Sequence, residues 1–166
     1  AFRRRFKFIY LGPNFDIIKD AGFKKEIFED LVEDEFINTA VNFFTSLNKT
    51  LEVLEVSIDN HIGHSYCIDL LSKLKFVVKN KGKENAKATF KTLFSRLWKN
   101  DLHLLVRDII GEYKIDNFVD SFFIELEKKK VNPQDLGFSS DSQNDFKKFL
   151  KSANPEENVG VFEEAA

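Results

Sequence analysis

The chain has 166 residues, of which 43% are hydrophobic and 31% are charged, and its 25 basic and 27 acidic side chains give a formal net charge of −2. This length and balance are typical of one ordinary globular domain that buries enough surface to fold without disulfides or metals. They exclude a disordered tail, a collagen-like fibre and a cysteine-stapled miniprotein. No apolar run approaches the roughly 20 residues of a membrane-spanning helix, so we do not expect an integral membrane protein.

Charge and proline-containing breaks divide the chain into three parts. Residues 1–12 mix basic and aromatic side chains. We expect them to form an arm whose apolar end packs on the core, with a membrane or nucleic-acid contact as the alternative. Residues 13–152 carry helical periodicity and form the expected single all-helical domain. Residues 153–166 are an acidic tail for which we expect little burial.

The first third of the domain predicts three helical stretches. Pro13 suits the first turn of a helix that Gly22 interrupts, and a second helix follows over 23–32. Apolar residues recur every three or four positions over 36–47, which predicts one buried stripe of a helix. Residues 51–58 also suit a strand, but because a lone strand has no partner we predict a helix there as well.

The middle of the domain continues this pattern. A wide apolar stripe over 66–78 predicts a central, largely buried helix. Asn85 and Asp101 are placed to cap the next two helices, and Gly111 suits the end of the second.

Two more helices complete the predicted fold. One covers 116–126 and has three lysines at its C-terminal end, where positive charge complements the helix dipole. The last is capped by Asp141 and ends near residue 150. Together these elements predict an all-α fold, a compact multi-helix bundle of about seven to nine short amphipathic helices joined by short loops.

The apolar content depends on phenylalanine, with 19 Phe against one Trp and three Tyr. Helical carriers of lipid-like ligands line a cavity between helices with large side chains. We therefore predict a non-enzymatic protein, without a cofactor, that binds an apolar or amphipathic small molecule in a Phe-lined cavity. The predicted ligand-binding residues are Phe43, Phe44, Phe90, Phe94, Trp98, Phe118, Phe122 and Phe123. The competing interpretation, in which these rings simply fill the core, stays open here.

Charge is unevenly distributed, which suggests a second function. Residues 14–35 carry three lysines against eight acidic residues, a net of −5, and residues 73–99 carry nine basic residues against one acidic residue, a net of +8. The alternative function is a helical protein-interaction module, such as an effector, adaptor or accessory subunit, that uses these two faces. The basic patch predicted to meet an anionic partner consists of Lys73, Lys75, Lys79, Lys81, Lys83, Lys87 and Lys91.

Other interpretations of the basic patch are also open. It can make a peripheral contact with an anionic membrane, or it can neutralise the acidic stretch within the same molecule. We do not expect nucleic acid as a partner, because the patch is nearly all lysine and its rings fall on the apolar face.

Three smaller features complete the list of candidate sites. His61, His64 and Cys67 stand three residues apart and would drift across one face of a continuous helix, which offers a transition-metal or haem site. Gly63 favours a helix start there instead. Asn48 opens an Asn-Lys-Thr glycosylation sequon. The sequence holds neither a Gly-x-Ser-x-Gly elbow nor a phosphate-binding glycine loop, so we predict no catalytic residues.

The sequence says little about the compartment. Methionine is absent, which we interpret as the mark of a processed or trimmed chain, and we favour a secreted protein over an intracellular or organellar one. The single cysteine forms no intramolecular disulfide and therefore leaves the redox compartment open.

Overall fold

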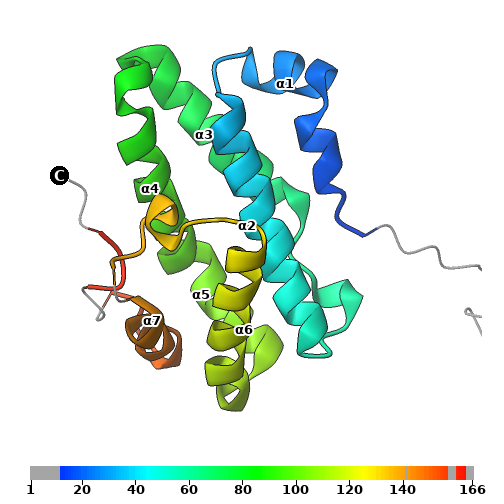
Figure 1. Cartoon of the computed structure of the whole chain (residues 1–166), viewed down its shortest axis with the longest axis vertical. Coiled ribbons are helices and arrows are strands. Elements are labelled where there is room, and N and C mark those ends of the chain that lie inside the picture. Colours follow the sequence, from blue (N-terminus) through cyan, green and yellow to red (C-terminus); the bar gives the residue numbers. More distant parts are fainter. Residues whose placement is uncertain (1–11, 141, 157–159, 164–166) are drawn as a thin grey trace, which may run out of the picture.

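Seven α-helices follow one another through residues 12–140, 142–156 and 160–163, which are the residues that the computed structural model describes (Figure 1). They are α1 (Ala21–Phe28), α2 (Asp34–Val53), α3 (His64–Lys81), α4 (Ala86–Leu97), α5 (His103–Ile110), α6 (Ile115–Lys128) and α7 (Ser142–Lys151). A π-helical turn, Trp98–Leu102, joins α4 to α5 without a break. The predicted all-α bundle is confirmed. When α4 and α5 are counted as one continuous helix, the described residues form slightly fewer helices than the seven to nine predicted.

The longest helix, α2, lies in the middle of the bundle. It packs on α6 and on α3, while α3 packs on α4 and α6 packs on α7. In Figure 1 α7 is seen end-on, so it runs across the direction of α2 and α6. The described ranges hold no β-strand, only an isolated antiparallel bridge between Phe138 and Phe162. None of their helices is long and apolar enough to cross a membrane.

The stripe predicted on 36–47 faces the core as expected. Ala40, Phe43, Phe44 and Leu47 are completely buried, and Phe36 is partly buried. The helix extends beyond the predicted stripe to Val53, so only the first three residues of the ambiguous segment 51–58 belong to it. After Val53 the chain turns through residues of non-helical conformation and forms a short 3₁₀ turn, Ile58–Asn60.

Three predicted helix boundaries are wrong. Gly22 lies inside α1, and the break comes at Asp20, whose carboxylate accepts a hydrogen bond from the Phe23 N–H at 3.0 Å. Asn85 does not cap α4, because the chain enters that helix from a 3₁₀ turn with Asn85 already in a helical conformation, and its amide donates to the Lys81 carbonyl at 3.1 Å. Asp101 lies within the π-helical turn and caps nothing.

Two other boundary predictions have different outcomes. Gly111 ends α5 as predicted, with φ of +76°, a conformation that glycine adopts easily. The predicted cap Asp141 lies outside the described residues, as does the predicted arm apart from Gly12.

The core is a continuous cluster of aromatic rings. Phe43 lies at its centre, with ring centroids at 4.7 Å from Phe94, 4.9 Å from Phe44, 5.7 Å from Phe122 and 5.9 Å from Trp98. All four pairs are edge-to-face, an arrangement that the ring quadrupole favours. The central helices are therefore held together by contacts between aromatic rings.

The acidic end of the chain contributes to this core, contrary to the expectation of little burial. Val161 is 1% exposed and Phe162 is 7% exposed, and the Phe162 ring packs on Phe138 and Phe149. Backbone hydrogen bonds tie this segment to the loop before α7, from the Glu163 N–H to the Gly137 carbonyl at 2.7 Å and from the Ser139 N–H to the Val161 carbonyl at 2.9 Å. Two apolar residues in an acidic stretch are enough to bring it back onto the domain.

Candidate functional site

The rings predicted to line a ligand cavity pack against one another. Seven of the eight are between 0% and 2% exposed, and Phe123 alone is partly exposed. The cavities described below are lined by Phe123 and by none of the other seven. These seven rings therefore belong to the buried aromatic cluster, and a ligand cavity among them stays a prediction.

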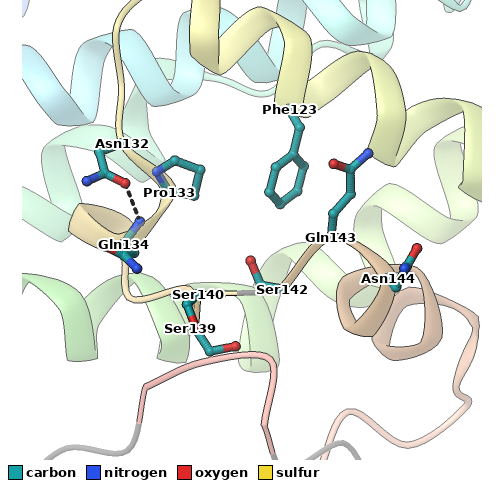
Figure 2. A pocket seen from close by; sticks show the side chains of 9 residues that line it. All are labelled: Phe123, Asn132, Pro133, Gln134, Ser139, Ser140, Ser142, Gln143 and Asn144. Atoms are coloured by element: carbon teal, nitrogen blue, oxygen red, sulfur yellow. Dashed lines mark hydrogen bonds between the residues drawn. The ribbon is translucent and has the colours of Figure 1, made fainter.

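An open groove lies where α6, α7 and the loop between them meet at Phe123 (Figure 2). It has two lobes of about 530 Å³ each, a size that suits a small-molecule ligand. The polar lobe is lined by Phe123, Asn132, Pro133, Gln134, Ser139, Ser140, Ser142, Gln143 and Asn144. The apolar lobe is lined by Asp120, Phe123, Ile124, Glu127, Lys130, Val131, Asn132, Pro133 and Gln143.

The loop between α6 and α7 is shaped by local hydrogen bonds and by one glycine. Asn132 accepts a hydrogen bond from the Gln134 N–H at 3.1 Å and so begins the 3₁₀ turn Pro133–Leu136. Gly137 follows with φ of +81° and approaches the backbone of Lys91 on α4. The loop is thereby held at both its beginning and its end, which keeps the wall of the groove in place.

The floor of the groove is the Phe123 ring, which rests on the aromatic core. Its centroid lies 5.6 Å from that of Phe138 and 6.2 Å from that of Phe146. Figure 2 shows the ring turned into the space between Pro133 and Gln143. Since Phe123 is supported from behind and open in front, it offers a fixed apolar surface to a ligand.

Contacts between α6 and α7 close the groove at one side. The Lys147 ammonium lies 2.7 Å from the Asp120 carboxylate, and the Gln143 amide donates to the same carboxylate at 2.8 Å. Lys147, and then Gln143, hold the pKa of Asp120 below its ordinary value, so this carboxylate stays ionised and engaged.

Sequence reasoning found Phe123 and missed the rest of the groove. Asn132, Ser142 and Gln143 come from a loop and from the first turn of α7, which have no periodic signal. The available signal was the Asn132-Pro133 break followed by the run of small polar residues over 139–144.

The predicted metal or haem cluster is not assembled. Gly63 is the N-terminal cap of α3, so His61 precedes the helix and the expected register is lost. His64 is exposed, whereas Cys67 is completely buried, which raises the pKa of its thiol to about 12. In the part of the chain that the structure describes, no three His, Cys, Asp or Glu side chains gather into a group that could hold a metal ion.

The side chain of the predicted glycosylation residue, Asn48, has a structural role. Its amide donates to the Ile62 carbonyl at 2.9 Å and accepts from the Ile62 N–H at 2.7 Å, which fixes the segment before α3 against α2. A glycan would attach to that same amide nitrogen, on a side chain that is only partly exposed. Glycosylation of Asn48 stays a prediction.

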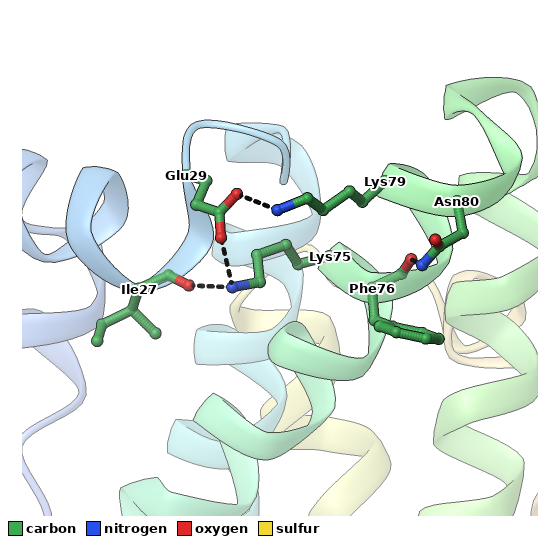
Figure 3. A network of polar contacts seen from close by, with 6 residues as sticks. All are labelled: Ile27, Glu29, Lys75, Phe76, Lys79 and Asn80. Carbon is green, nitrogen blue, oxygen red and sulfur yellow. Dashed lines mark hydrogen bonds and ion pairs between the residues drawn. The ribbon is translucent and has the colours of Figure 1, made fainter.

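Most of the predicted basic patch is paired within the molecule. Glu29, at the end of α1, binds Lys79 at 2.8 Å and Lys75 at 3.3 Å, and Lys75 also donates to the Ile27 carbonyl at 2.9 Å (Figure 3). These lysines, Lys79 first, hold the pKa of Glu29 below its ordinary value. The remaining described pairs are Lys73–Asp69, Lys83–Glu33 and Lys91–Glu163.

The acidic stretch is therefore one of the partners of the basic patch. Lys75, Lys79 and Lys83 reach Glu29 and Glu33, as the self-neutralising interpretation expects. These pairs are largely exposed, so each contributes little to stability. Lys81 and Lys87 are exposed and have no ion pair among the described residues.

Outside the groove, His103 is a buried titratable group at the contact of α5 with α7. It is 0% exposed, and its Nε2 lies 2.8 Å from the Phe149 carbonyl oxygen. Its Nδ1 has no hydrogen-bond partner in the described ranges. Burial lowers the pKa of His103, and the nearby Arg107 charge lowers it further against the opposing effect of the Phe149 carbonyl.

This lowered pKa predicts a loss of stability in mild acid. The unfolded chain takes up the proton near pH 6.5 and the folded chain does so only at lower pH, so the free energy of unfolding falls as the pH drops below about 6.5. The slope due to this one group is at most about 1.4 kcal/mol per pH unit. Denaturant titrations at pH 7 and pH 5 measure how far the free energy of unfolding falls between the two pH values. We expect a smaller fall for His103→Gln than for the wild type. The control His64→Gln, at an exposed site, should show the same fall as the wild type. Equal losses in all three proteins would contradict the assignment.

Comparison of the chain with protein-family models, with curated proteins and with solved structures gives no match.

Proposed function

We propose that this protein is a non-enzymatic binding protein whose open groove beside Phe123 takes an amphipathic small molecule. The observation that carries the proposal is the division of the groove into a polar and an apolar lobe that share Phe123, Asn132, Pro133 and Gln143. A ligand with a hydrogen-bonding head and an apolar tail would place each part in the lobe that matches it.

The apolar lobe offers the tail a surface that water covers poorly. Ile124 is 53% exposed on α6, beside the partly exposed Phe123 and next to Val131 and Pro133 in the lining. An alkyl chain lying on these side chains would remove apolar area from water, which is favourable by about 25 cal/mol per Å². The charged members of this lobe, Asp120, Glu127 and Lys130, leave that apolar surface between them.

The proposal keeps the amphipathic ligand expected from the sequence and moves it from the interior to the surface. The alternative function, a protein-interaction module that uses the basic and acidic faces, has less support. Five of the seven lysines of the basic patch already have a carboxylate partner within the molecule. A partner would therefore have to compete with these internal pairs.

The test is a nuclear magnetic resonance titration with octyl glucoside, an uncharged amphiphile, below the concentration at which it forms micelles. We expect backbone amide signals around residues 123–134 and 139–144 to shift in a saturable manner. The indole signal of Trp98, the single tryptophan, reports on the buried rings and is expected to stay in place. A shifted indole with unchanged groove signals would mean that the ligand enters the core and would overturn the proposal.

A matched pair of variants tests the apolar lobe. Ile124→Asn removes an exposed aliphatic side chain from the lobe, and we expect the affinity for octyl glucoside to fall about fivefold, because roughly half of an isoleucine's burial energy is lost. Leu104→Asn makes the same kind of change at a residue of similar exposure, 57%, on α5. It is expected to leave the affinity unchanged. Equal affinities of the two variants would place the alkyl chain elsewhere.

A further inference from the structure

We infer that residues 160–163 form a strap that occupies a peptide-docking site of its own molecule, and that the same site takes an extended segment of another protein. The segment recognised carries an apolar, an aromatic and an acidic residue in a row, as Val161, Phe162 and Glu163 do. The site shares Ser139 with the groove but does not depend on a ligand there. Three features carry the assignment: backbone pairing, a seat for an aromatic ring, and a cation placed for the acidic residue.

The strap pairs with the loop between α6 and α7 as one antiparallel strand pairs with another (Figure 1, red segment beside α7). Phe138 and Phe162 form the bridge. Ser139 donates through its N–H to the Val161 carbonyl at 2.9 Å and through its hydroxyl to the Gly160 carbonyl at 2.6 Å. The strap contributes only main-chain groups to these bonds. An extended segment of another protein has the same groups, and adding such a segment to an exposed backbone edge is a common mode of peptide recognition.

The seat for the aromatic residue is made by two rings from different elements. The Phe162 ring stacks on Phe138 of the loop, with centroids 5.2 Å apart, and meets Phe149 of α7 edge-to-face at 5.5 Å. Both of these rings are 0% exposed, and Phe162 itself is 7% exposed. One stacked and one edge-to-face contact are the arrangements that a further aromatic ring fills best. The seat therefore selects an aromatic residue at this position.

Lys91 supplies the cation for the residue that follows the ring. Its ammonium lies 2.9 Å from the Glu163 carboxylate. Both side chains are partly exposed, so the pair contributes more to selectivity than to affinity. The close approach of Gly137 to the Lys91 backbone fixes this lysine relative to the docking edge. An acidic residue after the aromatic one is therefore favoured over a basic one.

The strap is held more weakly than the helices around it. It belongs to none of the described helices, and it has one ion pair among the described residues. Fixing four residues in one conformation loses conformational entropy, which offsets much of the gain from burying Val161 and Phe162. By contrast, α7 buries Phe146, Phe149 and Leu150 completely. The strap can therefore leave while α7 stays, and a competing segment finds the site already formed.

The test is a titration of the full chain with a fluorescein-labelled peptide of its own residues 155–166, followed by fluorescence anisotropy. We expect Phe162→Ala to bind this peptide at least tenfold more tightly than the wild type. The reason is that the substitution weakens the tethered competitor, whose effective concentration is of millimolar order. Glu163→Lys, which places two lysines opposite each other, weakens the strap by a second route and is expected to raise peptide binding as well.

Two further peptides separate the recognised pattern from the rest of the sequence. A peptide that keeps only residues 160–163 within a glycine and serine sequence represents a segment of another protein, and it should bind Phe162→Ala within about threefold of the first peptide. The first peptide with alanine at position 162 should bind at least tenfold more weakly, because it leaves the seat empty. Equal binding of the aromatic and alanine peptides would overturn the inference.

The ion pair has a matched control on the same helix. In the Phe162→Ala background, Lys91→Gln is expected to lower the peptide affinity about threefold, the effect of one partly exposed pair. Lys87→Gln removes an exposed lysine of α4 and should leave the affinity unchanged. Equal losses in the two variants would mean that the acidic peptide is attracted by general charge and not by a built site.

Nuclear magnetic resonance locates the bound peptide. We expect the amide signals of residues 137–139 to shift on titration of Phe162→Ala, and their absence from the shifted set would place the peptide elsewhere and overturn the inference. Light scattering of the wild type tests the other occupant, a second copy of the chain. Dimers whose share rises with concentration, and which Phe162→Ala abolishes, would mean that the strap is exchanged between copies and would overturn the assignment to a foreign partner.

Discussion

Replacing Phe43 by alanine is expected to lower the free energy of unfolding by about 4 kcal/mol. The ring is 0% exposed and packs against four other rings of α2, α4, the π-helical turn and α6. Its removal loses the transfer energy of a whole aromatic side chain and leaves a void that these large neighbours cannot fill by small movements.

The matched control is Phe76→Ala, the same substitution on α3. Phe76 is 67% exposed, so its loss should change the free energy of unfolding by no more than about 0.5 kcal/mol. Urea titrations followed by circular dichroism measure both. If Phe43→Ala were no more destabilising than Phe76→Ala, the rings would surround a space rather than fill it, as the cavity predicted from the sequence expects.

Gly137→Ala is expected to be the most damaging change at a glycine. With φ of +81°, an added Cβ would lie 2.7 Å from the backbone oxygen of Lys91. The left-handed conformation alone costs about 1–2 kcal/mol for a residue with a Cβ. The backbone oxygen of a helix cannot move aside easily, so we expect a total loss of about 3 kcal/mol in the free energy of unfolding.

Gly160→Ala separates the two contributions. This glycine also has a positive φ, +128°, but an added Cβ there meets no atom within 4 Å. It is expected to be clearly less destabilising than Gly137→Ala in the same denaturant titration. Equal losses would mean that the loop between α6 and α7 does not approach α4 closely, and the fixed wall of the groove would then lose its support.

The helices were predictable because their burial pattern is local. The recurrence of apolar residues every three or four positions over 36–47 follows from one helix facing one core, and Ala40, Phe43, Phe44 and Leu47 are buried accordingly. Boundaries failed where the signal lay in conformation rather than composition. Asn85 has the side chain of a cap and the backbone of a helix, and no composition rule distinguishes these.

The helical periodicity of the sequence does not distinguish a filled core from a cavity lined by the same rings. A ring at a helical spacing points inward whether the interior is full or hollow, and the difference depends on where the facing helix places its own rings. Phe43 meets Phe94, Trp98 and Phe122 from elements about 50 to 80 residues away in the sequence. The same limit applies to the charges, because only the fold brings Glu29 to Lys75 and Lys79.

The groove was the least predictable part. Its members combine one partly exposed ring of α6 with loop and first-turn residues, and no periodic sequence pattern brings these together. The return of Val161 and Phe162 to the core was missed for a related reason. Two apolar residues within an acidic stretch carry no periodicity, and their burial depends on the surface that Phe138 and Phe149 provide.

The central claim is that the ligand lies in the groove and not among the buried rings, and a crystal structure of the protein with octyl glucoside tests it most directly. The account predicts the alkyl chain against Phe123 and Ile124 in the apolar lobe, with the sugar ring in the polar lobe. An alkyl chain between Phe43, Phe94 and Phe122, with these rings moved apart, would contradict it.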